Sequence, residues 1–564
     1  MAAVDAADAD GRLVWRHCKK DKRTLTLIME NLMKRKDMAA LVFLLAAGAQ
    51  AQNTFMNEQL TNGSQDVIGS ARYVGMGGAM GALGADLGTM AWNPAGIGLY
   101  RKSDVGLTFG GQWNKQRIAN ENRGTGTFDQ MGFVYSVKLG NETCPFFNVG
   151  FNYQKKANYN YNFYADNARL NGLSQMDQVA ELASKAYDTD FNLAGMAVDN
   201  KYLTPIYDNP DNPEEITGYY NKYGGENSLY TRHASGSLQG YDINFSANLK
   251  ERAYVGLNLG FDNVYYRSWS EYTEYNSYVN DLQETVQGDY SLYNDQKVTG
   301  YGINVKLGFI VRPIESNSFR IGLAIETPTW YRMKSSVLYD LTDIAVDPYQ
   351  RTDQKESYLE YTMRSPWKVR ASMGSTVGKS FAWDVDYEFA NYSRMHMGYP
   401  KYDEWDDYHT SFANTTDRAM NSHAEQTLKG VHTLRAGVEY RPTSALALRL
   451  GYNYITSAYK DQVGFDQYSI PSAAMDYATS TSYMRWGDTN ILTLGIGYRI
   501  KGFYVDLAYK VRNQNADFHA FDTSFAQGET DFTLANPDLL GRSIDPVDVN
   551  MTRQSIVCSL GFKF

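Results

Sequence analysis

Nine charged side chains lie in segments of the second half of the sequence in which apolar and polar residues alternate, and all nine fall on the polar face. Opposite charges on neighbouring segments of this kind would lie side by side and form ion pairs. A second role is open as well, because a guanidinium group can receive the carboxylate of a bound ligand, and Arg435 and Arg449 are the candidates for it. The nine residues are Asp384, Asp386, Glu388, Arg435, Glu439, Arg449, Arg499, Asp506 and Lys510.

Two short motifs near the N-terminus could be mistaken for ligand-binding loops. A glycine-rich run lacks the preceding strand and the βαβ context of a phosphate-binding loop, so we exclude nucleotide binding. Its small residues would instead let the backbone pack closely against a neighbouring surface. The Asn-Pro-Ala-Gly motif that follows is either a simple turn or an anchor for the same segment. The residues concerned are Gly75, Gly77, Gly78, Asn93, Pro94, Ala95 and Gly96.

Histidine, cysteine and acidic residues offer weaker signals for chemistry. His432 falls on an apolar strand face, but no serine occupies a matching position for a hydrolase triad. An acidic cluster at 403–407 could bind calcium but is more typical of a solvated loop. We therefore expect no enzyme activity, no cofactor and no metal site. Four histidines in predicted outer loops leave haem ligation as an alternative: His396, His409, His423 and His519.

The N-terminal region has the pattern of a secretory signal. Residues 33–36 are basic, residues 38–47 are apolar, and Ala49-Gln50-Ala51 fits a small-x-small cleavage site. We expect a signal peptide over 33–51 that is cleaved after Ala51, and a gene-model extension over 1–32. The alternative is a genuine helix over 13–47.

Composition narrows the class of protein further. The 564 residues include 14% aromatics, 44 of them Tyr, together with 48 Gly and 21% charged residues, at a mean hydropathy of -0.47. No apolar run reaches the roughly 18 residues of a spanning helix. The net charge of -9 argues against nucleic acid as a partner. A chain rich in Tyr and Gly and only moderately polar is typical of a membrane β-barrel, in which alternate residues face lipid.

From Ser103 onward the dominant pattern is period-2 alternation, as in Ala445–Tyr454, where Leu and Tyr alternate with polar or small residues. The pattern predicts an all-β, transmembrane, antiparallel barrel of fourteen strands over 103–564. The expected strands are 103–113, 130–138, 146–158, 236–250, 253–271, 296–312, 319–339, 358–376, 381–394, 426–441, 445–459, 483–500, 503–512 and 551–564.

The connections between these strands alternate between short and long. Short periplasmic turns and long outer loops are the expected asymmetry of an outer-membrane barrel, and the longest loop covers 159–235. The aromatic last strand is typical of the segment that the barrel-assembly machinery recognises. Residues 52–102 do not alternate and are too polar for lipid, so we expect them to form a hatch that plugs the barrel.

The segment from Gly69 to Val105, GSARYVGMGGAMGALGADLGTMAWNPAGIGLYRKSDV, resembles the N-terminal hatch of the FadL family of outer-membrane long-chain fatty-acid transporters. Two later runs are similar to the family's late strands: TLRAGVEYRPTSALALRLGYNY, from Thr433, and TLGIGYRIKGFYVDLAYK, from Thr493. The resemblance covers roughly Gly69 to the C-terminus and is weakest across the long loops.

The resemblance implies a monomeric outer-membrane barrel, in contact with outer-membrane lipid, that takes up hydrophobic small molecules. The family's cargo binds among the outer loops, then in an internal pocket, and leaves sideways through the wall. Long-chain fatty acids are the expected cargo. The long loop 159–235 departs from the family, so a haem receptor remains an alternative, as does a general diffusion porin.

Overall fold

The computed structural model describes residues 66–115, 124–185, 192–207, 216–346, 354–402, 410–460, 479–526 and 537–564. Outside the described residues lie the expected extension (1–32), the expected signal peptide (33–51), the start of the expected hatch (52–65), the acidic cluster (403–407) and His409.

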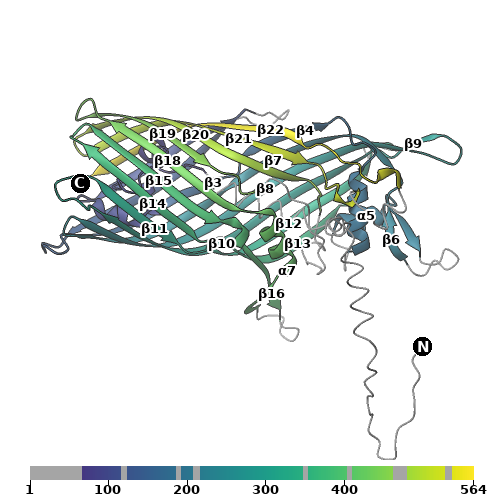
Figure 1. Cartoon of the computed structure of the whole chain (residues 1–564), viewed down its shortest axis with the longest axis horizontal. Coiled ribbons are helices and arrows are strands. Elements are labelled where there is room, and N and C mark those ends of the chain that lie inside the picture. Colours follow the sequence, from purple (N-terminus) through teal and green to yellow (C-terminus); the bar gives the residue numbers. More distant parts are fainter. Residues whose placement is uncertain are drawn as a thin grey trace, which may run out of the picture. The chain divides into compact units, whose positions relative to one another are not determined.

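Antiparallel strands pair side by side to form a closed β-barrel (Figure 1). The last strand, β22, pairs with the first, β1, from Asp104 opposite Lys563 to Asn114 opposite Arg553, so the sheet closes on itself. Among the described residues the wall has fourteen strand positions, which confirms the predicted number. Each predicted strand corresponds to one of these positions.

Three of the wall positions consist of two successive strands in line, and at a fourth position β4 (Tyr161–Asn167) continues β3 along the same neighbouring strand, β7. In order round the wall the positions are β1 (Asp104–Asn114), β2 (Gly124–Lys138), β3 (Phe146–Asn158), β7 (Gly224–Leu249), β8 (Ala253–Val279), β10 (Tyr290–Val311), β11 (Arg320–Glu326) with β12 (Trp330–Asp343), β14 (Lys368–Val377) with β13 (Lys355–Arg364), β15 (Phe381–Asn391) with β16 (His396–Tyr402), β18 (Gly430–Tyr440), β19 (Leu446–Ile455), β20 (Tyr483–Ile500), β21 (Phe503–His519) and β22 (Val547–Lys563).

The remaining elements belong to the hatch and to the connections. The hatch contains α4 (Ala71–Gly75), η3 (Leu87–Ala91) and η4 (Pro94–Leu99). The connections contain α5 (Gln175–Lys185), α6 (Leu193–Asp199), β5 (Thr204–Tyr207), β6 (Ile216–Tyr220), β9 (Thr285–Gln287), η5 (Tyr392–Arg394), β17 (Thr410–Thr416), α7 (Arg418–Thr427), η6 (Ser524–Ala526) and η7 (Pro537–Leu539). No helix in the described part of the chain is both long and apolar enough to cross a membrane.

The alternation in the sequence corresponds to an apolar outer face. On β20, Leu492, Leu494 and Ile496 are each about half exposed, whereas Thr493 between them is fully buried. The same alternation of exposed apolar and buried polar or small residues occurs on β14, β19 and β21. An exposed apolar surface that extends over this many neighbouring strands is typical of a protein face that contacts an apolar environment.

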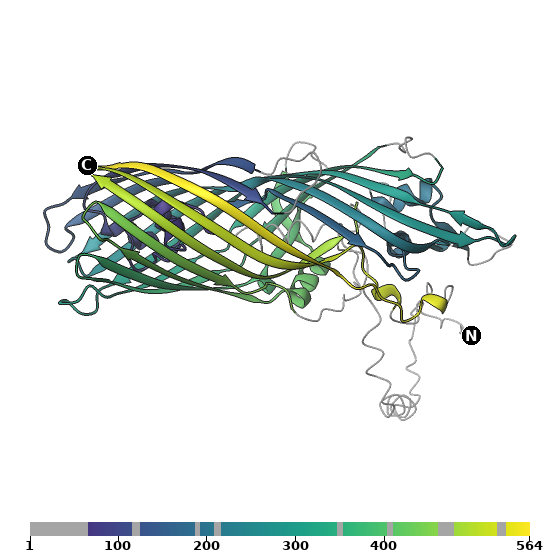
Figure 2. The same cartoon turned by 90° about the horizontal axis from the view of Figure 1, so that it is seen from above.

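The two ends of the barrel differ in their connections. At one end the strands are joined by tight turns, in which Lys250, Glu251 and Lys501 adopt positive φ values of 51° to 55°. The C-terminus lies at this short-turn end (Figures 1 and 2). The opposite, long-loop end carries α5, α6 and the β5–β6 hairpin. The predicted alternation of short and long connections is therefore present.

Two predicted strands were wrong in their continuity. The strands expected over 319–339 and 358–376 are each interrupted, at Thr327–Thr329 and at Ser365–Trp367. Each interruption contains a proline, Pro328 or Pro366, which has no N–H to donate to the ladder.

The connection expected over 159–235 is also more ordered than predicted. Its described part contains β4, α5 and α6, and its last part is the beginning of β7, whose 26 residues pair with β8 from Gly224 onward. A transmembrane strand needs about 10 residues. The strands β7, β8 and β10 therefore extend well beyond that length toward the long-loop end.

Candidate functional site

The hatch, of which residues 66–102 are described, lies inside the barrel toward the short-turn end, where Figure 2 shows it in purple. Its main-chain groups bond to side chains from several parts of the wall. Ala71 N donates to Ser559 on β22, and the carbonyls of Ile97 and Tyr100 both accept from Asn148 on β3.

Two aspartates of β15 hold four consecutive backbone N–H groups of the hatch. Asp386 accepts from Met80 N and Gly81 N at 3.1 Å, and Asp384 accepts from Ala82 N and Leu83 N at 3.0 and 2.7 Å. Both carboxyl groups are buried, so these hydrogen bonds lie away from water. The bonds fix the middle of the hatch to one strand of the wall.

Glycines allow the hatch to approach the wall more closely than side chains would permit. A Cβ on Gly77 would lie 2.9 Å from the backbone N of Tyr452, and one on Gly78 would lie 2.8 Å from the Arg435 side chain. Both residues also have positive φ values, 64° and 76°. Gly75 packs against Gly495, with a Cβ position 3.1 Å from its Cα. These are the close contacts predicted for the glycine-rich run.

The Asn-Pro-Ala-Gly motif joins the hatch to the opposite part of the wall. Asn93 caps η4 through Ala95 N, and its side-chain amide donates to Gly81 O at 2.9 Å. Pro94 O accepts from Ser246 Oγ of β7 at 2.9 Å. The motif is thus a turn that also contacts the wall. The sequence left open whether it is a simple turn or an anchor, and it has the features of both.

The expected ion-pair network forms only in part. Arg449 pairs with Glu439 and Asp506, and Glu388 and Lys510 pair with Arg370 and Asp66. The other four predicted members make no ion pair in the described part of the chain: Asp384, Asp386, Arg435 and Arg499.

Arg449 bonds to Glu439 at 2.7 Å and to Asp506 at 2.6 Å, and Arg72 of α4 reaches the same glutamate at 3.1 Å. With both sides of its guanidinium engaged, Arg449 holds the wall and the hatch together and does not line the cavity described next.

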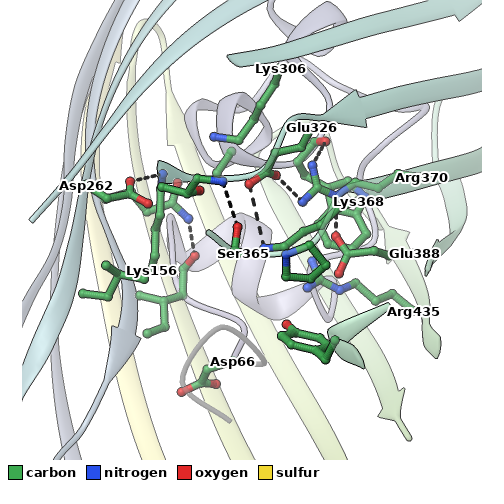
Figure 3. Close-up of a pocket in the computed structure, with 18 of the residues that line it drawn as sticks. Asp66, Lys156, Asp262, Lys306, Glu326, Ser365, Lys368, Arg370, Glu388 and Arg435 are labelled. Carbon is green, nitrogen blue, oxygen red and sulfur yellow. Dashed lines mark hydrogen bonds and ion pairs between the residues drawn. The ribbon is translucent and has the colours of Figure 1, made fainter. Parts of the chain in front are cut away.

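A cavity of about 90 Å³ lies on the long-loop side of the hatch (Figure 3). Most of its charged groups pair with one another. Arg370 bonds to Glu326 at 2.6 Å and to Glu388 at 2.5 Å, and Lys156 bonds to Asp262 at 2.6 Å. The lining combines these groups with apolar and aromatic ones: Ile68, Tyr73, Ala91, Trp92, Leu238, Tyr331, Pro366 and Tyr392.

Arg435 differs from the other cations of this cavity. It has no carboxylate within 4.0 Å in the described part of the chain, although it is 5% exposed. Its Nη1 donates to Tyr73 Oη at 2.8 Å, and its Nε is buried without a hydrogen-bond partner. The indole of Trp92 lies between Arg435 and Arg370, at 3.6 and 4.6 Å from the two guanidinium carbons. Of the two predicted candidates, the cavity therefore contains Arg435 and not Arg449.

Sequence reasoning missed most of the cavity. Lys368 and Arg370 point inward on β14, on either side of the outward-facing Val369. The alternation of apolar and polar residues in this strand could have identified both as lumen residues. Trp92 gave no signal, because its position beside Arg435 depends on how the hatch folds.

The strands that pass the cavity are apolar farther toward the long-loop end. Met333 follows Tyr331 on β12, and Met363 and Tyr361 occupy the facing strand β13, all of them buried. They belong to one apolar cluster that includes Met395, Met397 and residues of α5 and α6. Methionine side chains adapt their shape to irregular apolar partners. A cationic group thus lies at the base of an adaptable apolar region.

Three adjacent wall positions are interrupted at the level of this cavity. We call the segments Thr327–Thr329, Ser365–Trp367 and Tyr392–Met395 the wall break. Residues of all three segments line the cavity. The ladder between β15 and β18 ends at the wall break, with the pair Asn391–Gly430. On the long-loop side of the break, β17 pairs only with β16 among the described residues.

The other predicted candidates lie apart from the cavity. His432 faces outward, as predicted, and its Nδ1 lies 2.6 Å from the hydroxyl of Tyr387. In the described part of the chain no group of three or more His, Cys, Asp or Glu residues could hold a metal ion. His396, His423 and His519 lie on β16, α7 and β21.

Comparisons with known proteins add a likeness of fold at low identity. No family model and no curated protein matches the chain. Among solved structures it is similar to the toluene transporter TbuX of Ralstonia pickettii, at 13% identity over 88% of this chain and 99% of that chain, with a TM-score of 0.44. It is also similar to a FadL homologue of Pseudomonas aeruginosa, at 12% identity over 89% and 99%, with a TM-score of 0.46. Because these scores are low, the description of the fold depends on the strand pairing itself.

Proposed function

We propose that the chain is an outer-membrane channel that takes up hydrophobic small molecules bearing a carboxylate, with long-chain fatty acids as its main cargo. The membrane location is supported by the apolar outer face of a closed barrel, which would be costly to leave in water. The asymmetry of short turns and long loops supports an orientation with the loops outside.

The observation that carries the cargo proposal is Arg435, a buried cation that makes no ion pair within 4.0 Å in the described part of the chain, in a cavity below an apolar region. Asp386 faces Arg435 across the β15–β18 pair, but the aspartate accepts hydrogen bonds from the hatch, and the Nε of the arginine has no partner. A buried cation without a direct ion pair is costly, so the site would bind an anion more strongly than an exposed arginine would. The cavity itself is small, so the acyl chain would occupy the Met- and Tyr-rich region above it while the carboxylate reaches Arg435.

The hatch supports selective passage over general diffusion. Its bonds to β3, β15 and β22 leave the lumen filled at that level, which is the opposite of what a general diffusion porin requires. We propose that cargo moves passively, down its own gradient, and that it leaves sideways at the wall break rather than past the hatch. The ladder between β15 and β18 ends at this level, where Tyr392 N to Lys429 O at 3.3 Å is the next main-chain bond after the pair Asn391–Gly430. This end of the ladder supports the sideways route.

The test is uptake of labelled oleate by cells that lack the gene, with the intact gene or a variant gene restored. The intact gene should restore uptake, and Arg435→Gln should not. Arg101→Gln is the matched control, because Arg101 is an exposed arginine at the short-turn end that pairs with Glu251. Uptake that does not change when the gene is deleted would remove long-chain fatty acids as the main cargo.

A further inference from the structure

Three basic side chains stand on the outer face of the wall just beyond the aromatic edge of the apolar surface. We call Arg332 and Lys334 of β12 and Arg364 of β13 the outer basic cluster. The aromatic edge next to it consists of Trp330, which is 48% exposed and faces Arg364 across the strand pair, and Tyr301, which is 61% exposed and faces Arg332.

The strand register brings the three basic groups within reach of one ligand. Arg332 and Lys334 point to the same face because they are two residues apart on β12. Arg364 lies diagonally across from Arg332, and diagonal neighbours on one face have Cα atoms roughly 7–8 Å apart, within reach of long side chains. Three flexible cationic side chains at this spacing can converge on a single anion.

Two members of the cluster are not neutralised within the protein. Arg332 and Arg364 make no ion pair in the described part of the chain, whereas Lys334 pairs with Glu360 at 2.5 Å. Arg267 provides a contrast on the same side of the barrel, because it is bound by Asp295 at 2.7 Å. The cluster is therefore a local excess of positive charge on a chain whose net charge is -9.

Two strands on the far side of the barrel carry no equivalent group among their described residues. On β21 and β22 the outward residues that follow the apolar surface are neutral or acidic: Asn513, Asn515, Asp517, Asp548, Asn550 and Thr552. A basic group needed only for solubility would be expected round the whole rim. Exposed Lys297 of the neighbouring strand β10 lies diagonally across from Lys334 and adds to the basic groups on this side. Their concentration here indicates a partner on that side of the barrel.

We propose that the outer basic cluster binds the phosphate headgroup of an anionic lipid in the leaflet on the long-loop side. Guanidinium groups bind phosphate through paired hydrogen bonds, and Trp and Tyr mark the headgroup level of a membrane. The apolar residues directly below, Ile303 and Ile325, would contact the acyl chains of the same lipid. The site rests on the membrane location in the proposed function, but it is separate from the internal cavity.

The test is native mass spectrometry of the full chain in a neutral detergent, with diphosphoryl lipid A as the probe. The wild-type chain should retain this lipid, and lipid A without its phosphates should be retained roughly 10-fold less. The double variant Arg332→Gln, Arg364→Gln should lower retention of the phosphorylated lipid by roughly 10-fold as well. Arg267→Gln should leave retention unchanged, and excess inorganic phosphate should not displace the lipid.

Two outcomes would overturn the lipid site: equal retention of the two lipids by the wild-type chain, or full retention of the phosphorylated lipid by the double variant. Heat-modifiable migration on a gel confirms that each variant has folded. Oleate binding is measured on the same samples, because it depends on Arg435 inside the barrel. Loss of the lipid site with intact oleate binding would leave the proposed function standing, and the reverse result would count against the proposed function alone.

Discussion

The guanidinium carbon of Arg435 lies 3.6 Å from the centre of the Trp92 ring, so a wall residue and a hatch residue together form one side of the internal cavity. A cation over an indole face is stabilised by about 0.5–2 kcal/mol, but the ring does not neutralise the charge. The hatch therefore positions Arg435, which makes no direct ion pair in the described part of the chain, as well as filling the lumen. The first three predictions separate these two roles.

The carboxylate of a fatty acid should account for the effect of Arg435. Arg435→Gln removes a charge-assisted hydrogen bond worth about 1.5–3 kcal/mol, so oleate should bind the purified chain roughly 10- to 100-fold more weakly. Oleyl alcohol has the same chain without the charge, and its binding should change little. Isothermal titration with both ligands measures the difference, with Arg101→Gln as the control. Equal losses for the two ligands would mean that the variant damages the apolar region instead.

Gly77 should be necessary for the hatch to close the barrel. An alanine there would have both an unfavourable φ of 64° and a Cβ 2.9 Å from the wall backbone at Tyr452. Gly77→Ala should therefore displace the hatch and raise the leak of small hydrophilic solutes into liposomes that contain the protein. Gly111→Ala is the control, because a Cβ on Gly111 meets nothing within 4 Å. A leak that matches the control would show that residues 66–102 do not seal the barrel.

The aspartate pair of β15 should protect the middle of the hatch from exchange with solvent. Asp384→Ala combined with Asp386→Ala leaves four N–H groups, from Met80 to Leu83, without their acceptors. Each buried N–H left unpaired costs about 1–3 kcal/mol. Hydrogen exchange at these amides should accelerate by roughly 5- to 150-fold, which corresponds to about 1–3 kcal/mol, while exchange in β1 and β22 stays slow. Asp295→Ala, which removes a partly exposed carboxylate that pairs with Arg267 away from the hatch, is the control. Unchanged protection in the double variant contradicts the role given to the pair.

The sequence predicted the wall well where one face of a strand meets lipid. On β20 the alternation of Leu492, Leu494 and Ile496 with small or polar residues follows directly from that environment. The first half of β7 was assigned to a loop, because beyond the apolar surface its inward face mixes apolar Tyr230 and Ala234 with Ser228 and Arg232, and its outward face is largely polar. In this part, Thr231 and Arg232 do not follow the alternation of apolar and polar residues, although they pair with β8 as regularly as the second half of β7 does.

The candidate site was only half predictable for a different reason. Arg435 and Arg449 have the same parity and lie on neighbouring strands, so alternation treats them alike. What separates them is the register that brings Glu439 and Asp506 to Arg449, together with a hatch that brings Trp92 and Tyr73 to Arg435. Both depend on contacts between residues that are far apart in the sequence, which local patterns do not contain.

Glu274 should hold the outer helix α5 in place over the long-loop end. Its buried carboxylate accepts from Ser174 Oγ at 2.5 Å, Gln175 N at 3.0 Å and the hydroxyl of Tyr272 at 2.6 Å, and it makes no ion pair in the described part of the chain. Truncation to alanine leaves these donors unpaired, at a cost of about 1–3 kcal/mol each.

Glu274→Ala should therefore release α5 without unfolding the barrel. Limited proteolysis should cleave the 159–235 connection at least several-fold faster than in the wild-type chain, while heat-modifiable migration stays normal. The matched control is Glu226→Ala, which removes an exposed carboxylate on β7 that accepts from Ser277 Oγ. Because α5 shares an apolar cluster with Met333 and Met363, its release should also weaken binding of oleate and oleyl alcohol to the same extent. A loss confined to oleate would instead connect Glu274 to the carboxylate site at Arg435, which its position on β8 beneath α5 does not predict.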